Sequence, residues 1–131
     1  MKKTKGLLFF ALFLLIFSVS SVVQASGDTE GPKVYAAVGT SNTTIEVLFN
    51  EELDQATAEA ATNYTIAKIT GTATPITVFD AELLSDNKTV KLTISSMEIG
   101  NVYQLNVQNV EDTSGNPVNP GNATVMFAGH Q

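Results

Sequence analysis

The amino-acid sequence predicts an all-β protein, built as an antiparallel sandwich of two sheets. Two observations lead to this prediction. Apolar residues recur at every second position in segment after segment, and turn-forming residues separate these segments at intervals of roughly 10 to 15 residues. Alternation with a period of two is typical of strands that bury one face. About seven short strands in one small domain are typical of two packed sheets.

Five segments show the alternation clearly. In each of them the apolar residues at every second position are expected to form the buried face of a strand. These residues are Val34, Ala36 and Val38; Ile45, Val47 and Phe49; Val90, Leu92 and Ile94; Tyr103, Leu105 and Val107; and Ala123, Val125 and Phe127.

Two weaker segments complete the expected set of strands, one over residues 64–69 and one over residues 76–83. In the second segment the apolar face changes from Ile76 and Val78 to the set Phe79, Ala81 and Leu83. An extra residue within a strand shifts the alternation in this way, so we expect a β-bulge there.

Turn signals separate the strands, at residues 39–42, 85–88, 98–101 and 112–121. Asp86 or Asn87 is expected to adopt a positive φ and to close a hairpin, because Asn and Asp tolerate that conformation. Gly115 is expected to supply a positive φ in the last of these loops. Tyr103 should face the core with a hydroxyl that needs a partner, and a tyrosine corner to a nearby backbone group would satisfy it.

One segment breaks the β pattern. Residues 54–62 are rich in Ala, which favours one short helix or a pair of turns. A crossover of this kind lets successive strands belong to different sheets. It therefore favours the sandwich over the alternative of a single up-and-down barrel.

Residues 1–25 have the three regions of a secretory signal peptide. Basic residues come first, residues 7–17 form an unbroken apolar run, and cleavage is expected between Ala25 and Ser26, after a small residue at Val23. The alternative is a retained membrane anchor, since the apolar run with its extension to Val23 is about long enough to cross a bilayer.

Cleavage would leave residues 26–131, with four Lys, no Arg and thirteen acidic residues, which gives a formal net charge of −9. A surface of this charge repels phosphate backbones and anionic membranes. We therefore expect no nucleic-acid partner, and no membrane insertion after cleavage. Residues 26–31 are polar and are expected to form a disordered lead-in.

The composition also removes most catalytic chemistries. The absence of Cys excludes thiolate nucleophiles and thiolate zinc sites, and the single His, His130, lies beside the C-terminus. Paired carboxylates can serve a glycosidase, but a domain of this size has little volume for a cleft, and no Trp is present to stack on a sugar. We expect a protein that is not an enzyme, with a hydrolase as the third hypothesis.

Acidic residues gather at several places, which raises the question of calcium, an ion that binds about six to eight oxygen ligands. The richest loop supplies the calcium candidates Asp112, Ser114 and Asn116, but it lacks the spacing of an EF-hand loop. Solvated turn chemistry is the competing interpretation, and we expect no cofactor. The other acidic groups are Glu51, Glu52 and Asp54, and the pair Asp80 and Glu82.

Five pieces of sequence form an ordered set along the chain. They are Phe49-Asn50-Glu51-Glu52-Leu53-Asp54, Asn63-Tyr64-Thr65-Ile66, residues 83–92, Gly100-Asn101-Val102-Tyr103-Gln104-Leu105-Asn106-Val107, and Asp112-Thr113-Ser114-Gly115-Asn116. In this order they resemble the bacterial Ig-like domain named after the S-layer protein SbsA. The resemblance implies an Ig-like β-sandwich over residues 32–128, with one short helical crossover.

The resemblance implies a role at the bacterial cell surface. The first hypothesis is a secreted, non-enzymatic Ig-like module of the cell envelope, associated with the wall or the S-layer. Its partner would be an envelope protein or polysaccharide. The alternative is a soluble protein that binds a carbohydrate or a peptide through its end loops, with or without the aid of calcium.

Overall fold

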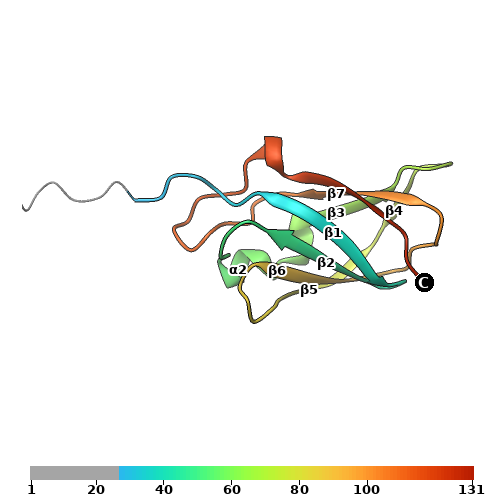
Figure 1. The fold of residues 1–131 in the computed structure, drawn as a ribbon, viewed down its shortest axis with the longest axis horizontal. Coiled ribbons are helices and arrows are strands. Elements are labelled where there is room, and N and C mark those ends of the chain that lie inside the picture. The colour runs from blue at the N-terminus through green and yellow to red at the C-terminus, as the bar shows by residue number, and fades with distance from the viewer. Residues whose placement is uncertain (1–26) are drawn as a thin grey trace, which may run out of the picture.

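The computed structural model describes residues 27–131 (Figure 1). The expected signal peptide and its cleavage site at Ala25 and Ser26 lie outside the described residues. Eight strands are present in the described chain: β1 (Val34–Ser41), β2 (Thr44–Phe49), β3 (Tyr64–Lys68), β4 (Thr74–Ile76), β5 (Val78–Leu83), β6 (Thr89–Ile94), β7 (Val102–Val107) and β8 (Thr124–Ala128).

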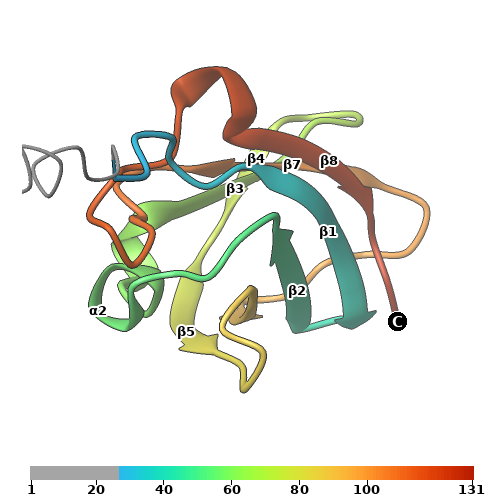
Figure 2. The same cartoon turned by 60° about the vertical axis from the view of Figure 1, so that its left-hand side comes forward.

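The strands form two antiparallel sheets of four strands each. One sheet has the order β1-β2-β6-β5 and the other has the order β4-β3-β7-β8. The two sheets lie face to face as the layers of a sandwich (Figure 2). This arrangement confirms the predicted fold class and removes the single barrel as an alternative.

The alternating apolar residues fill the space between the sheets. Tyr103 and Leu105 on β7 are almost wholly buried, and the Tyr103 ring stacks on Phe127 of β8 with the ring centroids 5.6 Å apart. Burial of these side chains removes apolar surface from water, which is the main driving force for folding. From the other sheet the core receives Ile45, Val47 and Phe49 of β2 and Val90, Leu92 and Ile94 of β6.

Two residues that the alternation places in the core are exposed, and a shift of register explains each. The pairing of β1 with β2 shifts between Val34 and Ala36, so Ala37 turns inward and Val38 is 50% exposed. The pairing of β5 with β6 shifts between Val78 and Asp80, which confirms the expected bulge. Phe79 lies at this bulge and is 64% exposed. A shift of one residue moves a side chain to the opposite face of a sheet.

The segment 76–83, expected as one strand, is divided at Thr77 between the two sheets. Ile76 of β4 pairs with Ile66 of β3, whereas Val78 of β5 pairs with Ile94 of β6. The chain thus passes from one layer to the other within three residues. This break gives eight strands where the sequence predicts about seven.

The Ala-rich segment forms the expected crossover, as the short helix α2 (Gln55–Ala58) and the 3₁₀ turn η1 (Ala61–Asn63) between β2 and β3. The Asp54 carboxylate caps α2 by accepting a hydrogen bond of 3.0 Å from the Thr57 N–H. The buried Tyr64 hydroxyl donates to the Ala58 carbonyl at 2.6 Å. Burial, together with the charge of Glu59, raises the pKa of Tyr64.

The hairpin between β5 and β6 closes as the sequence predicts. Asn87 adopts a φ of 58°. Asp86 Oδ1 accepts hydrogen bonds from the N–H groups of Lys88 and Thr89, and Asp86 Oδ2 accepts one from the Thr89 hydroxyl at 2.6 Å. The positive φ of Asn87 and the hydrogen bonds of Asp86 therefore close this turn with residues of the turn itself.

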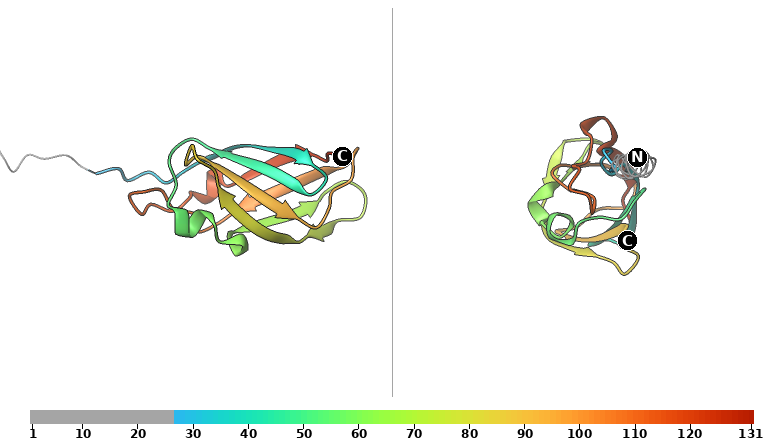
Figure 3. Two further views of the ribbon diagram at one scale, coloured as in Figure 1. Left: turned by 90° about the horizontal axis from the view of Figure 1, so that it is seen from below. Right: turned by 90° about the vertical axis from the view of Figure 1, so that its left-hand side faces the viewer.

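The two ends of the described chain lie at opposite poles of the sandwich (Figures 1 and 3). The segment 27–33, called the lead-in below, arrives at the pole that also carries α2 and the loop 108–123. The C-terminus leaves from the other pole. Within residues 27–131, the helices are all too short or too polar to cross a membrane.

Candidate functional site

The loop 108–123 is held in one conformation by its own residues. The Val118 N–H donates to the Val110 carbonyl at 2.7 Å, and both side chains are buried. The turn η2 (Pro120–Asn122) starts with Pro, whose fixed φ suits the first position of a helix. The side chain of Asn119 caps this turn by accepting a hydrogen bond of 2.9 Å from the Gly121 N–H. The loop therefore presents a stiff surface at its pole.

Asp112 organises the first half of this loop. Its side chain is 2% exposed, and Oδ1 accepts hydrogen bonds from the N–H groups of Ser114 and Asn116 at 2.8 and 2.9 Å. Oδ2 accepts one from Asn116 Nδ2 at 2.9 Å. Burial alone would raise the pKa of Asp112, but these hydrogen bonds outweigh it and hold the pKa below its ordinary value.

The structure thus brings the three calcium candidates together, with N–H donors of Ser114 and Asn116 directed at the Asp112 carboxylate. Gly115, between them, has a φ of 87°, which closes the turn. This geometry accounts for the acidic and amide residues of the motif as turn chemistry. The calcium hypothesis for Asp112, Ser114 and Asn116 stays a prediction.

A different acidic grouping appears at the same pole. Asp28, Glu51 and Asp112 each bring a carboxylate oxygen to within 4.8 Å of the others. Burial and the neighbouring charges of Asp112 and Asp28 raise the pKa of Glu51. The sequence pattern does not predict this grouping, because its members are far apart in the chain. Two contacts bring them together: an antiparallel β-bridge between Leu53 and Asp112, and the hydrogen bonds between Lys33 of the lead-in and Asn50.

The remaining acidic candidates are not part of the grouping of Asp28, Glu51 and Asp112, and one of them has a structural role. Asp54 caps α2, and Glu52 is exposed. Asp80 and Glu82 are exposed on β5, where Glu82 forms an ion pair of 2.7 Å with Lys91. His130 is exposed beside the C-terminus, at the other pole.

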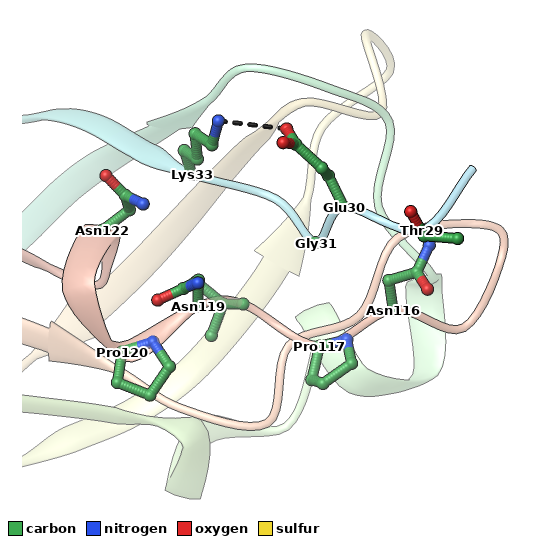
Figure 4. A pocket seen from close by; sticks show the side chains of 10 residues that line it. Thr29, Glu30, Gly31, Lys33, Asn116, Pro117, Asn119, Pro120 and Asn122 are labelled. Carbon is green, nitrogen blue, oxygen red and sulfur yellow. Dashed lines mark hydrogen bonds and ion pairs between the residues drawn. The ribbon is translucent and has the colours of Figure 1, made fainter.

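A cleft of about 500 Å³ lies between the lead-in and the second half of the loop (Figure 4). Its walls carry amide side chains, two Pro rings and one ion pair, in which Lys33 Nζ lies 3.1 Å from a Glu30 carboxylate oxygen. Figure 4 shows Asn119 beside the ring of Pro120, with the ring of Pro117 further along the same loop. Sequence reasoning missed this cleft because its two walls are more than 80 residues apart in the chain.

Two four-stranded sheets, a short helical crossover and turn-rich loops at both poles define an Ig-like sandwich module. The chain belongs to the family of bacterial Ig-like domains, whose sequence profile matches residues 20–128. This match confirms the family resemblance that the ordered sequence pieces predict.

Relatives of this chain occur in much longer surface proteins. It is 32% identical over 104 residues to an outer cell wall protein of Brevibacillus brevis. The aligned residues make up 79% of this chain and 10% of that protein. The fold resembles crystal structures of the S-layer protein SbsC, with a TM-score of 0.68 and 25% identity over 76% of this chain. The match covers 14% of one of these SbsC chains and 23% of another. The chain thus spans about a tenth of the length of the cell wall protein that it matches.

Proposed function

We propose that the protein is a secreted, non-enzymatic Ig-like module of a bacterial cell envelope, and that it acts by contact with an envelope protein or polysaccharide. The observation that carries the proposal is the 32% identity to an outer cell wall protein over 104 residues, or 79% of this chain. The similarity to S-layer structures supports the same location.

The arrangement of the poles supports a role by contact. One pole receives the lead-in, and the opposite pole releases the C-terminus (Figure 3). A sandwich of this kind leaves the outer faces of both sheets and the loops of both poles open to partners. Loops that a rigid scaffold positions are the usual place for recognition.

The roles of two acidic side chains and the place of the single His support the non-enzymatic part of the proposal. Asp112 and Asp54 are engaged in a turn and in a helix cap. Acid–base chemistry at neutral pH most often uses His, and His130 is exposed in the terminal segment.

Fractionation of the host bacterium tests the location. We expect an antibody against the sandwich to detect the protein in the wall fraction or the medium, without its first 25 residues. A signal confined to the cytosol would contradict the proposal. Co-sedimentation of residues 26–131 with purified host cell walls tests contact, with an unrelated acidic protein of similar size as the control.

A screen against glycans and peptides tests the absence of catalysis. We expect no turnover by the purified domain. Reproducible turnover that disappears on replacement of Asp54, Asp80 or Asp112, with the fold intact by circular dichroism, would overturn this part of the proposal.

A further inference from the structure

The cleft between the lead-in and the loop 108–123 is formed before any ligand binds. Gly31 lies so close to the loop that an added Cβ would meet the Pro117 carbonyl oxygen, and so only Gly fits there. Asn116 Nδ2 donates to the Asp28 carbonyl at 3.0 Å and ties the loop to the lead-in. A preformed site loses less conformational entropy on binding than one that must be ordered.

The walls of the cleft carry polar groups that the described residues do not use. Within residues 27–131, no hydrogen bond engages the side-chain amide of Asn122, the Nδ2 group of Asn119 or the hydroxyl of Thr29. An amide side chain offers donors and an acceptor side by side. The rings of Pro117 and Pro120 are exposed and add apolar surface beside these groups (Figure 4). The mostly polar lining, with Pro rings beside the amides, can thus offer hydrogen bonds and apolar contact to the same ligand.

The charge around the cleft selects against anionic ligands. Lys33 is paired with Glu30, so it adds a donor without a net positive charge. Asp28, within the lead-in, groups with Glu51 and Asp112 at this pole, and residues 26–131 carry a net charge of −9. Phosphate-rich or carboxylate-rich polymers meet repulsion at this surface.

The backbone of the loop selects against an extended peptide. Peptides that add to a sheet edge need a row of free N–H and C=O groups. Pro117 and Pro120 have no N–H, and the Val118 and Gly121 N–H groups are already bonded within the loop. A saccharide needs no such row, because its hydroxyls bind side-chain amides and its C–H face packs on Pro rings.

We propose that this cleft binds a short neutral saccharide, as a segment of an envelope polysaccharide. The inference rests on the proposed function, which places the protein in the cell envelope. It names a neutral saccharide as the partner that the protein contacts there. An open site without an aromatic platform is expected to bind with a dissociation constant of about 1 mM.

Nuclear magnetic resonance titration of ¹⁵N-labelled residues 26–131 tests the proposal. The probes are the trimer of N-acetylglucosamine, maltotriose, a neutral tripeptide and poly-glutamate. We expect at least one trisaccharide to shift the amide signals of Thr29, Asn119 and Asn122 in a saturable way. Asn122→Ala should weaken that binding about tenfold or more, the loss expected for a hydrogen bond of about 1.4 kcal/mol.

Asn42→Ala is the matched control, because Asn42 is an exposed Asn at the opposite pole, in the turn between β1 and β2. Thr29→Val is a second cleft variant for the case in which Asn122→Ala disturbs the loop. The proposal is overturned by the absence of saccharide shifts at about 10 mM probe, ten times the expected constant. Equal binding by the wild type and both cleft variants, or preferred binding of the tripeptide or poly-glutamate, would also overturn it.

Wall association of the domain that persists in Asn122→Ala would leave the proposed function standing and reject the cleft. Saccharide binding by a protein found only in the cytosol would do the reverse.

Discussion

The hydroxyl of Tyr103 accepts a hydrogen bond of 2.7 Å from the backbone N–H of Glu98, five residues earlier in the chain. The bond joins β7 to the loop that precedes it, while the Tyr103 ring stacks on Phe127 in the core. A buried hydroxyl without a partner is costly, so this bond allows a polar atom to lie at the edge of an apolar core. The same side chain thus fixes a strand and a loop.

Tyr103→Phe is expected to destabilise the fold by about 1 kcal/mol, and by up to about 3 kcal/mol because the Glu98 N–H loses its partner. Urea denaturation followed by circular dichroism measures the change in midpoint. Tyr35→Phe is the matched control, since Tyr35 is 61% exposed on β1, and its midpoint should not move. Equal midpoints for all three proteins would show that the bond contributes nothing.

Glu51→Gln is expected to stabilise the protein at pH 7. The folded state raises the pKa of Glu51, through burial and the charges of Asp112 and Asp28. Its favourable contribution is therefore present below the ordinary Glu pKa of about 4.3 and is lost as the pH rises through the folded-state pKa. At pH 7 the charged Glu51 opposes folding, and the neutral amide removes that repulsion.

Urea midpoints at pH 7 and below about pH 4 check this prediction, since Glu51 is neutral at the lower pH and the variant should then gain little. Glu52→Gln is the control, because Glu52 is the exposed neighbour. A gain at pH 7 that is equal in both variants would instead indicate a general effect of net charge.

Gly115→Ala is expected to cost about 1 to 2 kcal/mol, the usual penalty for an L residue in the left-handed region. Gly115 has a φ of 87°, and an added Cβ would meet nothing within 4 Å. Gly27→Ala is a matched control, because Gly27 also has open space but no positive φ. Thermal melts compare the two variants, and a loss of the same size in both would contradict the argument from φ.

Secretion is expected to produce a mature chain that begins at Ser26. N-terminal sequencing of the exported protein measures this directly. Ala25→Phe should block release, because signal peptidase requires a small residue at that position. Intact Met1 on protein from the membrane fraction would support the retained anchor instead.

Local pattern was sufficient for most of the fold. Ile45, Val47 and Phe49 alternate with polar residues and are buried as predicted. Asn87 closes the expected hairpin with its positive φ. These features depend only on a few neighbouring residues, and so the local sequence is sufficient to predict them.

Register could not be read in the same way. Val38 and Phe79 are apolar and in phase with their strands, yet pairing shifts in β1 and β5 leave both exposed. The break at Thr77 likewise depends on which sheet each half joins. Pairing partners far along the chain decide such shifts, and alternation within one segment carries no information about them.

The sequence by itself determined the fold class of this protein, a two-sheet sandwich, because period-two burial and turn motifs are local. Its ordered sequence pieces also resemble the family of bacterial Ig-like domains, which the sequence profile confirms. The sequence also predicted a turn at Gly115 and the need of the Tyr103 hydroxyl for a nearby backbone partner, without naming that partner. Only the tertiary structure decided which residues lie close together at the pole where the lead-in arrives. The grouping of Asp28, Glu51 and Asp112 and the cleft beside Asn122 join segments far apart in the chain, and it is the packing of the lead-in against the loop that creates both.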